Sequence, residues 1–229
     1  MEKFNRFAIY YVPPVGPLHD AASSWLGWDI IRGCSVKYPD LAGLPCSVAD
    51  ITKTPRKYGF HGTIKPPFKL ADGCNFSDLQ ANISQLCKRL APVRTDGLNL
   101  TQLGRFLALT PTGTSDDLTE LGARVVQELD GCRAPADDAE LNRRRMAGLN
   151  PRQEAYLIKW GYPYVLEEFK FHLTLSGSLD PCLAAHSKSI LQPLLMPLLP
   201  SPFEINDLAL CGEGTDGFFY LLKRYQLEG

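Results

Sequence analysis

Hydrophobic and polar positions in the first half of the chain predict alternating strands and helices. The stretch RFAIYYV at 6–12 is aromatic and β-branched and stops at PPVGP, which is typical of a strand followed by a turn. Apolar residues then recur with spacings of three and four from Leu18, which predicts a helix over 18–28. The stretch 33–54 contains several glycines and prolines without a firm period, so we expect a loop there.

The first half continues with YGFHGTIKPPF at 58–68, which predicts a second strand. Ser77 and Gln80 have the spacing of a capping box, which places a helix start at Ser77. The apolar face of that helix consists of Leu79, Ile83, Leu86 and Leu90. The stretch 96–113 then predicts a hairpin.

The second half repeats this order of elements. A strand begins at Arg105, and an amphipathic helix follows from about residue 115. A polar insertion, ELNRRRMAGLN at 140–150, precedes a helix that starts at Asn150–Pro151. The last elements are a strand at 167–177, a leucine-rich helix from Asp180 that Pro193 and Pro197 should end, and a hairpin at 203–225.

A short motif shows that the two halves are related. FHGT around His61 aligns with FHLT around His172, and the next similar strand begins 37 residues after His61 and 36 residues after His172. The matched motif and spacing indicate an internal duplication. We therefore expect one α+β unit spanning 1–229, with two antiparallel sheets and outer helices. Its two lobes should be built mainly from the repeats 6–103 and 104–225.

Alternation along the two motif strands separates an apolar face from a polar one. In the first copy, the polar face should hold Gly59, His61, Thr63 and Lys65, opposite Tyr58, Phe60, Gly62 and Ile64. In the second copy, it should hold Lys170, His172, Thr174 and Ser176, opposite Phe169, Phe171, Leu173 and Leu175. A cation, an imidazole and a hydroxyl on one sheet face are costly unless that face is wet or binds a ligand.

A single histidine in a strand is more often structural than catalytic. Here two of the four histidines lie in matched registers, each with a hydroxyl two residues later, which favours a catalytic pair. The other two, His19 and His186, lie on predicted helices without such neighbours, and we expect both at the surface.

The duplicated F-H-x-T strands, about 110 residues apart, resemble the two-histidine (2H) phosphoesterase superfamily, which includes 2′-5′ RNA ligase-like proteins. RKYGFHGTIKPPF and WGYPYVLEEFKFHLTLSG are similar to the branch of that superfamily associated with phosphonate-utilisation operons. The resemblance implies that the two strands lie side by side, related by a pseudo-twofold axis, at the bottom of a cleft between the lobes. It also implies that a phosphodiester binds between His61 and His172.

The motif residues suit acid–base chemistry on such a substrate. One neutral imidazole would accept a proton and the other, protonated, would donate one to the leaving oxygen. The threonines Thr63 and Thr174 would donate hydrogen bonds to phosphate oxygens, and Lys65 and Lys170 would offset developing charge. Which histidine is the acid stays open, because the repeats are nearly equivalent.

Further polar and aromatic residues near the motifs are candidate substrate contacts. Ser176 would extend the phosphate site, and Arg56 is a candidate second anion contact. Tyr58 would hydrogen-bond or stack with the substrate, or pack in the core. The run Arg143–Arg145 would be either a solvated basic face or a lid that contacts a terminal phosphate, and Trp160 and Tyr162 would stack on a base or act as struts.

Composition narrows the remaining choices. The chain of 229 residues has a net charge of −1, which disfavours binding to long nucleic acid. Its seven cysteines are scattered, which fits a reducing compartment. No apolar run suits a membrane span or a signal peptide, so we expect a cytoplasmic monomer. No residue cluster calls for a metal or other cofactor.

These features predict a metal-independent phosphoesterase that hydrolyses a small cyclic phosphodiester by paired-histidine catalysis. The substrate would be a 2′,3′-cyclic nucleotide or a ribose cyclic phosphate, and the resemblance places the reaction in phosphonate metabolism. Two alternatives stay open: RNA end-processing by 2′-5′ ligation or trimming, and a non-catalytic module that binds a nucleotide or sugar phosphate.

Overall fold

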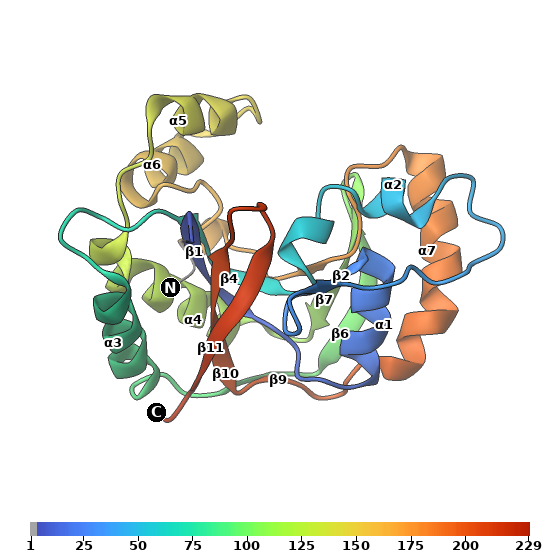
Figure 1. Cartoon of the computed structure of the whole chain (residues 1–229), viewed down its shortest axis with the longest axis horizontal. Helices are drawn as coiled ribbons and strands as arrows, with labels where there is room; N and C mark the ends of the chain where they lie inside the picture. The colour runs from blue at the N-terminus through green and yellow to red at the C-terminus, as the bar shows by residue number, and fades with distance from the viewer. Residues whose placement is uncertain (1–3) are drawn as a thin grey trace.

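One continuous antiparallel sheet of seven strands forms the centre of the computed structural model, which describes residues 4–229 (Figure 1). Its spatial order is β11 (Phe219–Gln226), β10 (Asp207–Glu213), β1 (Arg6–Tyr11), β4 (Gly62–Phe68), β8 (Leu173–Thr174), β7 (Phe106–Thr112) and β6 (Gly97–Leu103). The predicted α+β class with antiparallel strands is confirmed. The two expected sheets meet edge to edge between β4 and β8, where Gly62 pairs with Leu173.

The strands of the two repeats are exchanged across this junction. By sequence, β1, β4 and β6 of the first repeat correspond to β7, β8 and β10 of the second. In space, β10 pairs with β1 and β6 pairs with β7, so each half of the sheet contains strands from both repeats. The prediction that each lobe is built mainly from one repeat, 6–103 or 104–225, is therefore wrong. Periodicity identifies a strand but says nothing about its partner, which long-range contacts decide.

The helices are divided between the two ends of the sheet (Figure 1). One end carries α3 (Phe76–Cys87), α4 (Asp116–Glu128), α5 (Asp138–Arg145) and α6 (Pro151–Trp160). The other end carries α1 (Pro17–Leu26), α2 (Val48–Thr52) and α7 (Pro181–Leu195). Two short ribbons, β2 (Trp28–Asp29) with β3 (Cys34–Ser35) and β5 (Val93–Thr95) with β9 (Phe203–Ile205), complete the pairing.

Three local predictions need correction. The helix expected from Ser77 begins at Phe76, because Asn75 caps it and forms the capping box with Asp78. The helix from Asp180 contains Pro193 and continues to Leu195 before a 3-10 turn, Met196–Leu198. The expected loop at 33–54 contains β3 and α2.

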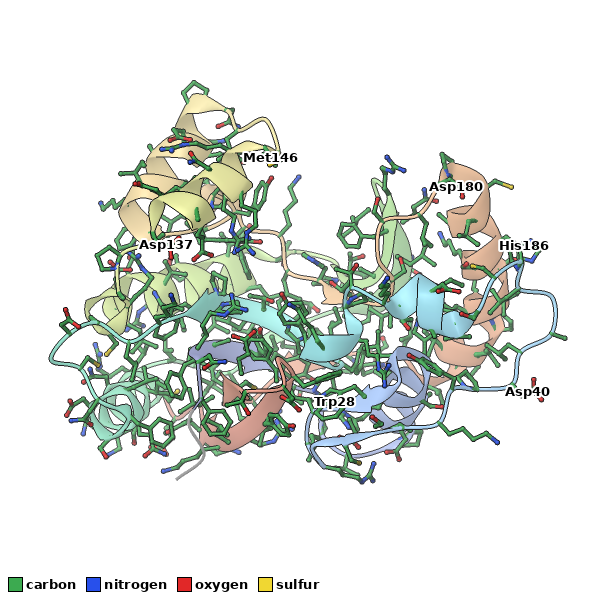
Figure 2. The ribbon with its side chains drawn as sticks, turned by 45° about the horizontal axis from the view of Figure 1, so that its top comes forward. Trp28, Asp40, Asp137, Met146, Asp180 and His186 are labelled. Carbon is green, nitrogen blue, oxygen red and sulfur yellow. The ribbon has the colours of Figure 1, made fainter. Side chains whose placement is uncertain are left out.

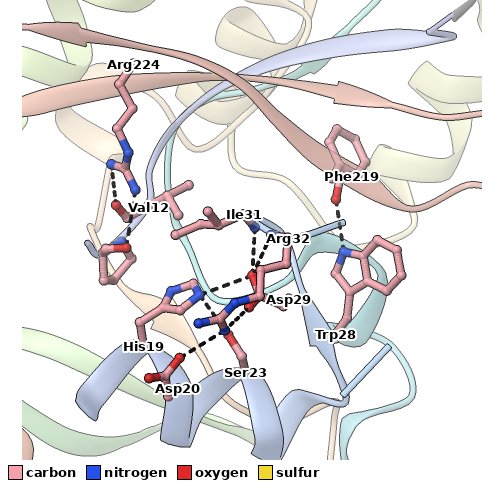
Figure 3. Close-up of polar contacts among 11 residues, drawn as sticks. Val12, His19, Asp20, Ser23, Trp28, Asp29, Ile31, Arg32, Phe219 and Arg224 are labelled. Atoms are coloured by element: carbon pink, nitrogen blue, oxygen red, sulfur yellow. Dashed lines mark hydrogen bonds and ion pairs between the residues drawn. The ribbon is translucent and has the colours of Figure 1, made fainter. Parts of the chain in front are cut away.

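A buried polar cluster beneath α1 overturns the expectation that His19 lies at the surface (Figure 3). His19 is fully buried, and its Nε2 lies 3.3 Å from Asp29 Oδ1 and 3.2 Å from the Ser23 hydroxyl. Asp29 also accepts hydrogen bonds from the backbone N–H groups of Ile31 and Arg32. Both contacts of His19 use the same ring nitrogen, so the cluster is not a proton relay; it fixes the turn after α1. His186 is exposed, as predicted.

The two faces of the sheet have different coverings. The main core contains Phe7, Ile9 and Tyr11 of β1 with the apolar faces of the helices. The opposite face carries a smaller cluster, in which Ala8, Tyr10 and Val12 pack with Trp28, Ile30, Ala209, Cys211 and Phe219. In the part of the chain that the structure describes, no helix is long and apolar enough to cross a membrane.

Candidate active site

The two His-x-Thr motifs meet at the centre of the sheet. Gly62 and Leu173, the middle residues of the motifs, are directly paired between antiparallel strands. Continued by one residue in each direction, this register sets His61 opposite Thr174 and Thr63 opposite His172. Directly opposed residues have Cβ atoms about 5 Å apart, so the four side chains form a compact square.

Alternation puts these four side chains on the polar face, as predicted. The intervening residues Phe60, Ile64, Phe171 and Leu173 are all buried in the main core. Gly62 permits the close crossing, because a Cβ atom at this position would overlap the Phe171 ring. The apolar residues on the opposite face of each strand thus fix the position of the two histidines and two threonines.

The imidazole of His61 is oriented by two hydrogen bonds. Its Nδ1 donates to the carbonyl oxygen of Gly59 at 3.0 Å, since a carbonyl can only accept. Its Nε2 is therefore an acceptor in the neutral ring, and the Thr63 hydroxyl lies 3.1 Å from it. Gly59 has φ of +67°, and a Cβ atom there would lie 2.7 Å from Ile30 Cβ, so this turn requires glycine.

His172 is held in the same way. Its Nδ1 donates to the Lys170 carbonyl oxygen at 2.7 Å, again two residues upstream. The repeat thus supplies the same orienting contact twice, and it leaves Nε2 as the nitrogen that can exchange a proton in each ring.

The two imidazoles differ in environment. Burial lowers the pKa of His61 to about 4, although the Gly59 hydrogen bond opposes the shift, and the charge of His172 lowers it further. Burial also lowers the pKa of His172, opposed by the hydrogen bond to Lys170. His61 is 9% exposed, whereas His172 is only half-buried. His172 is therefore the imidazole that solvent and ligands reach more easily.

Aromatic side chains that the sequence did not single out flank both histidines. The Tyr10 ring lies 3.9 Å from the His61 ring, centre to centre, and the Phe106 ring lies 5.4 Å from that of His172. Tyr10 and Phe106 belong to the strands that border the two motif strands. Their position follows from strand pairing, for which a single sequence carries no signal.

Tyr58 lies on the same side as His61. It ends a 3-10 turn, Arg56–Tyr58, so strand alternation does not apply to it. Its ring lies 6.0 Å from the His61 ring and 5.2 Å from Phe219. Tyr58 is thus a half-buried neighbour of the site rather than a residue of the main core.

Lys65 is not part of this site. Thr63 and Lys65, two residues apart, pair with consecutive residues of β1, so β4 contains a β-bulge between them. The bulge turns Lys65 to the helix-covered face, where its Nζ donates to Val126 O at 2.9 Å and lies 3.6 Å from Asp130. Burial lowers the pKa of this amine to about 8. The prediction that Lys65 shares a face with His61 is wrong.

Ser176 is also structural. It is 1% exposed, its hydroxyl accepts the Leu107 N–H at 2.8 Å, and it donates to the Gly177 carbonyl. The Ser176 hydroxyl thus binds the backbone of β7, just after the end of β8. Its predicted role in the phosphate site is not supported. β8 ends at Thr174, and the N–H groups of both Leu175 and Ser176 then donate to the same Leu107 carbonyl, so regular alternation does not extend to this position.

The remaining predicted contacts lie around the site. Lys170 is exposed beside His172. The Arg56 guanidinium lies 5.7 Å from the Tyr38 ring and 5.8 Å from the Phe218 ring, and its buried Nε has no partner. Arg56 therefore contacts an aromatic pair rather than either histidine.

The polar insertion forms an arm at one end of the sheet. Figure 2 shows Met146 at the tip of this arm and Asp180, at the start of α7, on the other side of the molecule's upper surface. Between residues 4 and 229, no group of three or more His, Cys, Asp or Glu side chains is arranged to hold a metal ion.

A family model described as "Protein of unknown function (DUF1045)" matches residues 63–220, from the first motif threonine into β11. The chain belongs to the DUF1045 family. The match covers the second His-x-Thr strand, the insertion and most of the sheet, so these features belong to the family region.

Two curated relatives are named ribose 1,5-bisphosphate phosphokinase PhnN. That of Janthinobacterium sp. (strain Marseille) is 38% identical over 180 residues, which cover 78% of this chain and 40% of the relative. That of Laribacter hongkongensis (strain HLHK9) is 33% identical over 178 residues, covering 76% of this chain and 40% of the relative. The chain thus spans about 40% of the length of these relatives.

Solved structures with a similar outline include E. coli LigT complexed with 3′-AMP, at 13% identity over 99% of this chain and 100% of LigT, with a TM-score of 0.45. TT0787 of Thermus thermophilus is 14% identical over 98% of both chains, with a TM-score of 0.47. At such values, the likeness says nothing about the activity of this chain.

Proposed function

We propose that this protein is a phosphoesterase that opens a small cyclic phosphodiester by paired-histidine acid–base catalysis. The observation that carries the proposal is the direct pairing of Gly62 with Leu173, which brings both His-x-Thr motifs onto one face. Two imidazoles and two hydroxyls in this arrangement match the demands of phosphodiester hydrolysis, and the resemblance to 2H phosphoesterases supports the same reaction.

The unequal environments of the histidines support a division of roles. His61 is neutral over the whole neutral pH range and accepts a proton at Nε2 from the attacking water. The water oxygen bonds to phosphorus and one ring P–O bond breaks. His172, the more accessible imidazole, gives its Nε2 proton to the leaving oxygen. When the substrate binds, the Thr63 hydroxyl turns from His61 Nε2 to a non-bridging oxygen, and Thr174 donates to the other. The product is a phosphate monoester with a free hydroxyl.

The names of the curated relatives favour a ribose cyclic phosphate as the substrate of this chain. Both relatives are named as kinases that act on ribose 1,5-bisphosphate. A phosphate that bridges O1 and O2 of ribose 5-phosphate becomes ribose 1,5-bisphosphate when water cleaves its P–O2 bond. Such a reaction would supply the kinase substrate, and it fits the phosphonate metabolism that the sequence resemblance implies.

The proposal is tested by incubating the protein with ribose 1,2-cyclic phosphates and 2′,3′-cyclic nucleotides in EDTA. We expect hydrolysis to persist in the chelator and to fall about 10²- to 10⁴-fold in His61→Asn and in His172→Asn. The asparagine amide can still donate to the carbonyl that orients each ring. His186→Asn, on an exposed helix position, is the matched control.

A folded wild-type protein that hydrolyses no cyclic phosphodiester would refute the proposal. Activity that disappears with EDTA would refute metal independence alone. Binding of these compounds without turnover would identify a binding module instead.

A further inference from the structure

The three consecutive arginines of α5 point in three directions. Successive helix residues are about 100° apart, so only one of them can face inward. Arg143 is 64% exposed, and Arg145 is bound to Glu154 through Nε at 2.9 Å and Nη2 at 2.8 Å. Arg144 is 25% exposed and lies over the Tyr162 ring, 4.6 Å from its centre. The run is therefore not a uniformly solvated basic face.

Arg144 keeps unused hydrogen-bonding capacity. A guanidinium has five N–H donors. The described partners of Arg144 are Glu140, at 3.3 Å from Nη2, and Tyr162, and its buried Nε has no partner. A buried donor without an acceptor is unfavourable, so an anion that reaches this guanidinium would gain a bond that the protein does not satisfy itself.

A series of side-chain contacts connects Arg144 with the strand that carries His61. Glu140, which binds Arg144, lines a small cavity together with Arg6, and the Arg6 guanidinium lies 6.0 Å from the centre of the Phe219 ring. The Phe219 ring lies 5.2 Å from that of Tyr58. The Tyr58 ring in turn lies 6.0 Å from that of His61. Contacts through Glu140, Arg6 and two aromatic rings thus lead from Arg144 to His61. This path favours Arg144 for a second group on the same substrate, away from the phosphate that His61 would contact.

Hydrogen bonds join α6, the second helix of the arm, to the segment that leads to His172. On α6, Arg152 Nε donates to Glu168 at 2.7 Å and Gln153 donates to the same carboxylate at 2.9 Å. Glu168 ends the 3-10 turn Leu166–Glu168, four residues before His172. The far end of α6 rests on Arg133, which donates to the Lys159 carbonyl at 3.0 Å. These bonds fasten α6 to the segment that enters the site.

The helix that carries Arg144 contributes nothing to the core. None of its residues is buried, and it is held by Arg145 and by its Asp137 cap. Beneath it, a small cavity lined by residues that include Arg6, Lys69 and Glu140 separates it from the sheet. The contacts of α5 with α6 and the following segment include the Arg145–Glu154 ion pair and the stacking of Arg144 on Tyr162, so this helix adds little to the core and is free to serve ligand binding.

We infer that Arg144 is a specificity-determining residue that binds a second anionic group of the substrate, a phosphate monoester remote from the cyclic phosphodiester. The inference rests on the proposed function for the identity of the substrate. The planar guanidinium matches two phosphate oxygens at once and can exchange its long bond to Glu140 for them. The substrate class is therefore a cyclic phosphate of a sugar phosphate rather than of a free sugar.

The test compares kcat/KM for ribose 1,2-cyclic phosphate with and without a 5-phosphate. Wild type should prefer the phosphorylated substrate by about tenfold to a hundredfold, the loss typical of one charge-assisted hydrogen bond. Arg144→Ala should reduce this ratio to near one, and Arg144→Lys should restore part of it. Arg143→Ala removes the same charge one residue away and should keep the wild-type ratio.

Three results would overturn the inference. These are a wild-type ratio near one, an equal loss on both substrates in Arg144→Ala, and an equal effect of Arg143→Ala on the ratio. If wild type hydrolyses neither compound, the proposed function fails, and calorimetric binding of ribose 5-phosphate decides the inference. Affinity weakened about tenfold or more in Arg144→Ala but not in Arg143→Ala would support it; equal affinities would overturn it.

Discussion

The unequal burial of the two histidines has a direct consequence for the pH dependence of catalysis. kcat/KM reports the pKa values of the free enzyme. In the proposed mechanism the base, His61, must be neutral, which holds above its pKa of about 4. The acid His172 must be protonated, which holds only below a pKa that burial keeps under its ordinary value of about 6.5. The profile should therefore be a bell with its maximum in mildly acidic solution.

The magnitude follows from the desolvation of His61. A pKa of about 4 instead of 6.5 corresponds to about 3 kcal/mol against the charged ring. Between pH 6.5 and 4 the unfolded chain binds a proton at His61 that the folded protein does not, so stability falls as the pH falls through this window. His61→Asn should remove this part of the acid destabilisation.

The assay measures kcat/KM from pH 3.5 to 8 at constant ionic strength, together with thermal unfolding over the same range. His61→Asn should lose the acid limb, and His172→Asn should lose the alkaline limb. His186→Asn should keep both limbs. A maximum above pH 7 in the wild type, or loss of the alkaline limb in His61→Asn, would refute the assignment of roles.

Other variants test the architecture around the site. Lys65→Ala should cost about 2–4 kcal/mol of unfolding free energy by guanidinium titration, because it leaves a cavity, removes the donor to the Val126 carbonyl and leaves Asp130 with Arg133 as its remaining partner. The kcat of the folded enzyme should stay unchanged, and a loss of kcat at normal stability would show that Lys65 belongs to the site. Ser176→Ala should cost about 1–3 kcal/mol in the same titration, since it leaves the Leu107 N–H without its acceptor, and a raised KM at full stability would contradict this. Gly62→Ala should cost about 1–3 kcal/mol of unfolding free energy and lower kcat, because its methyl group would force the two motif strands apart. Phe171→Leu should relieve part of both effects, and additive effects in the double variant would argue against a direct clash.

Much of the secondary structure followed from local patterns. The strand at 6–12 and the helix start at Asn150 correspond to β1 and α6. The capping box was misplaced because Asn75 was available as a cap two residues before Ser77. Pro193 did not end α7, because packing of a long helix outweighs the loss of one backbone bond.

The residues of the candidate site also divide into those that local patterns identify and those that depend on tertiary contacts. Its two histidines and two threonines could be read from the duplicated motif, and their common face from alternation. Lys65 and Ser176 could not be placed, because a bulge and the end of strand pairing interrupt the alternation. Tyr10, Phe106 and Arg144 could not be selected from many similar residues, because their importance depends on what lies opposite them.

The sequence by itself determined which groups the candidate site contains: two matched imidazole–hydroxyl pairs, each on a strand whose other face is apolar. This information is local, because the pleat of a strand alternates side chains whatever its neighbours are. Only the tertiary structure decided that the repeats exchange strands, that β4 lies beside β8, and that one arginine of the arm faces inward. Those outcomes depend on contacts between residues up to about two hundred positions apart, whose free energies no local pattern contains.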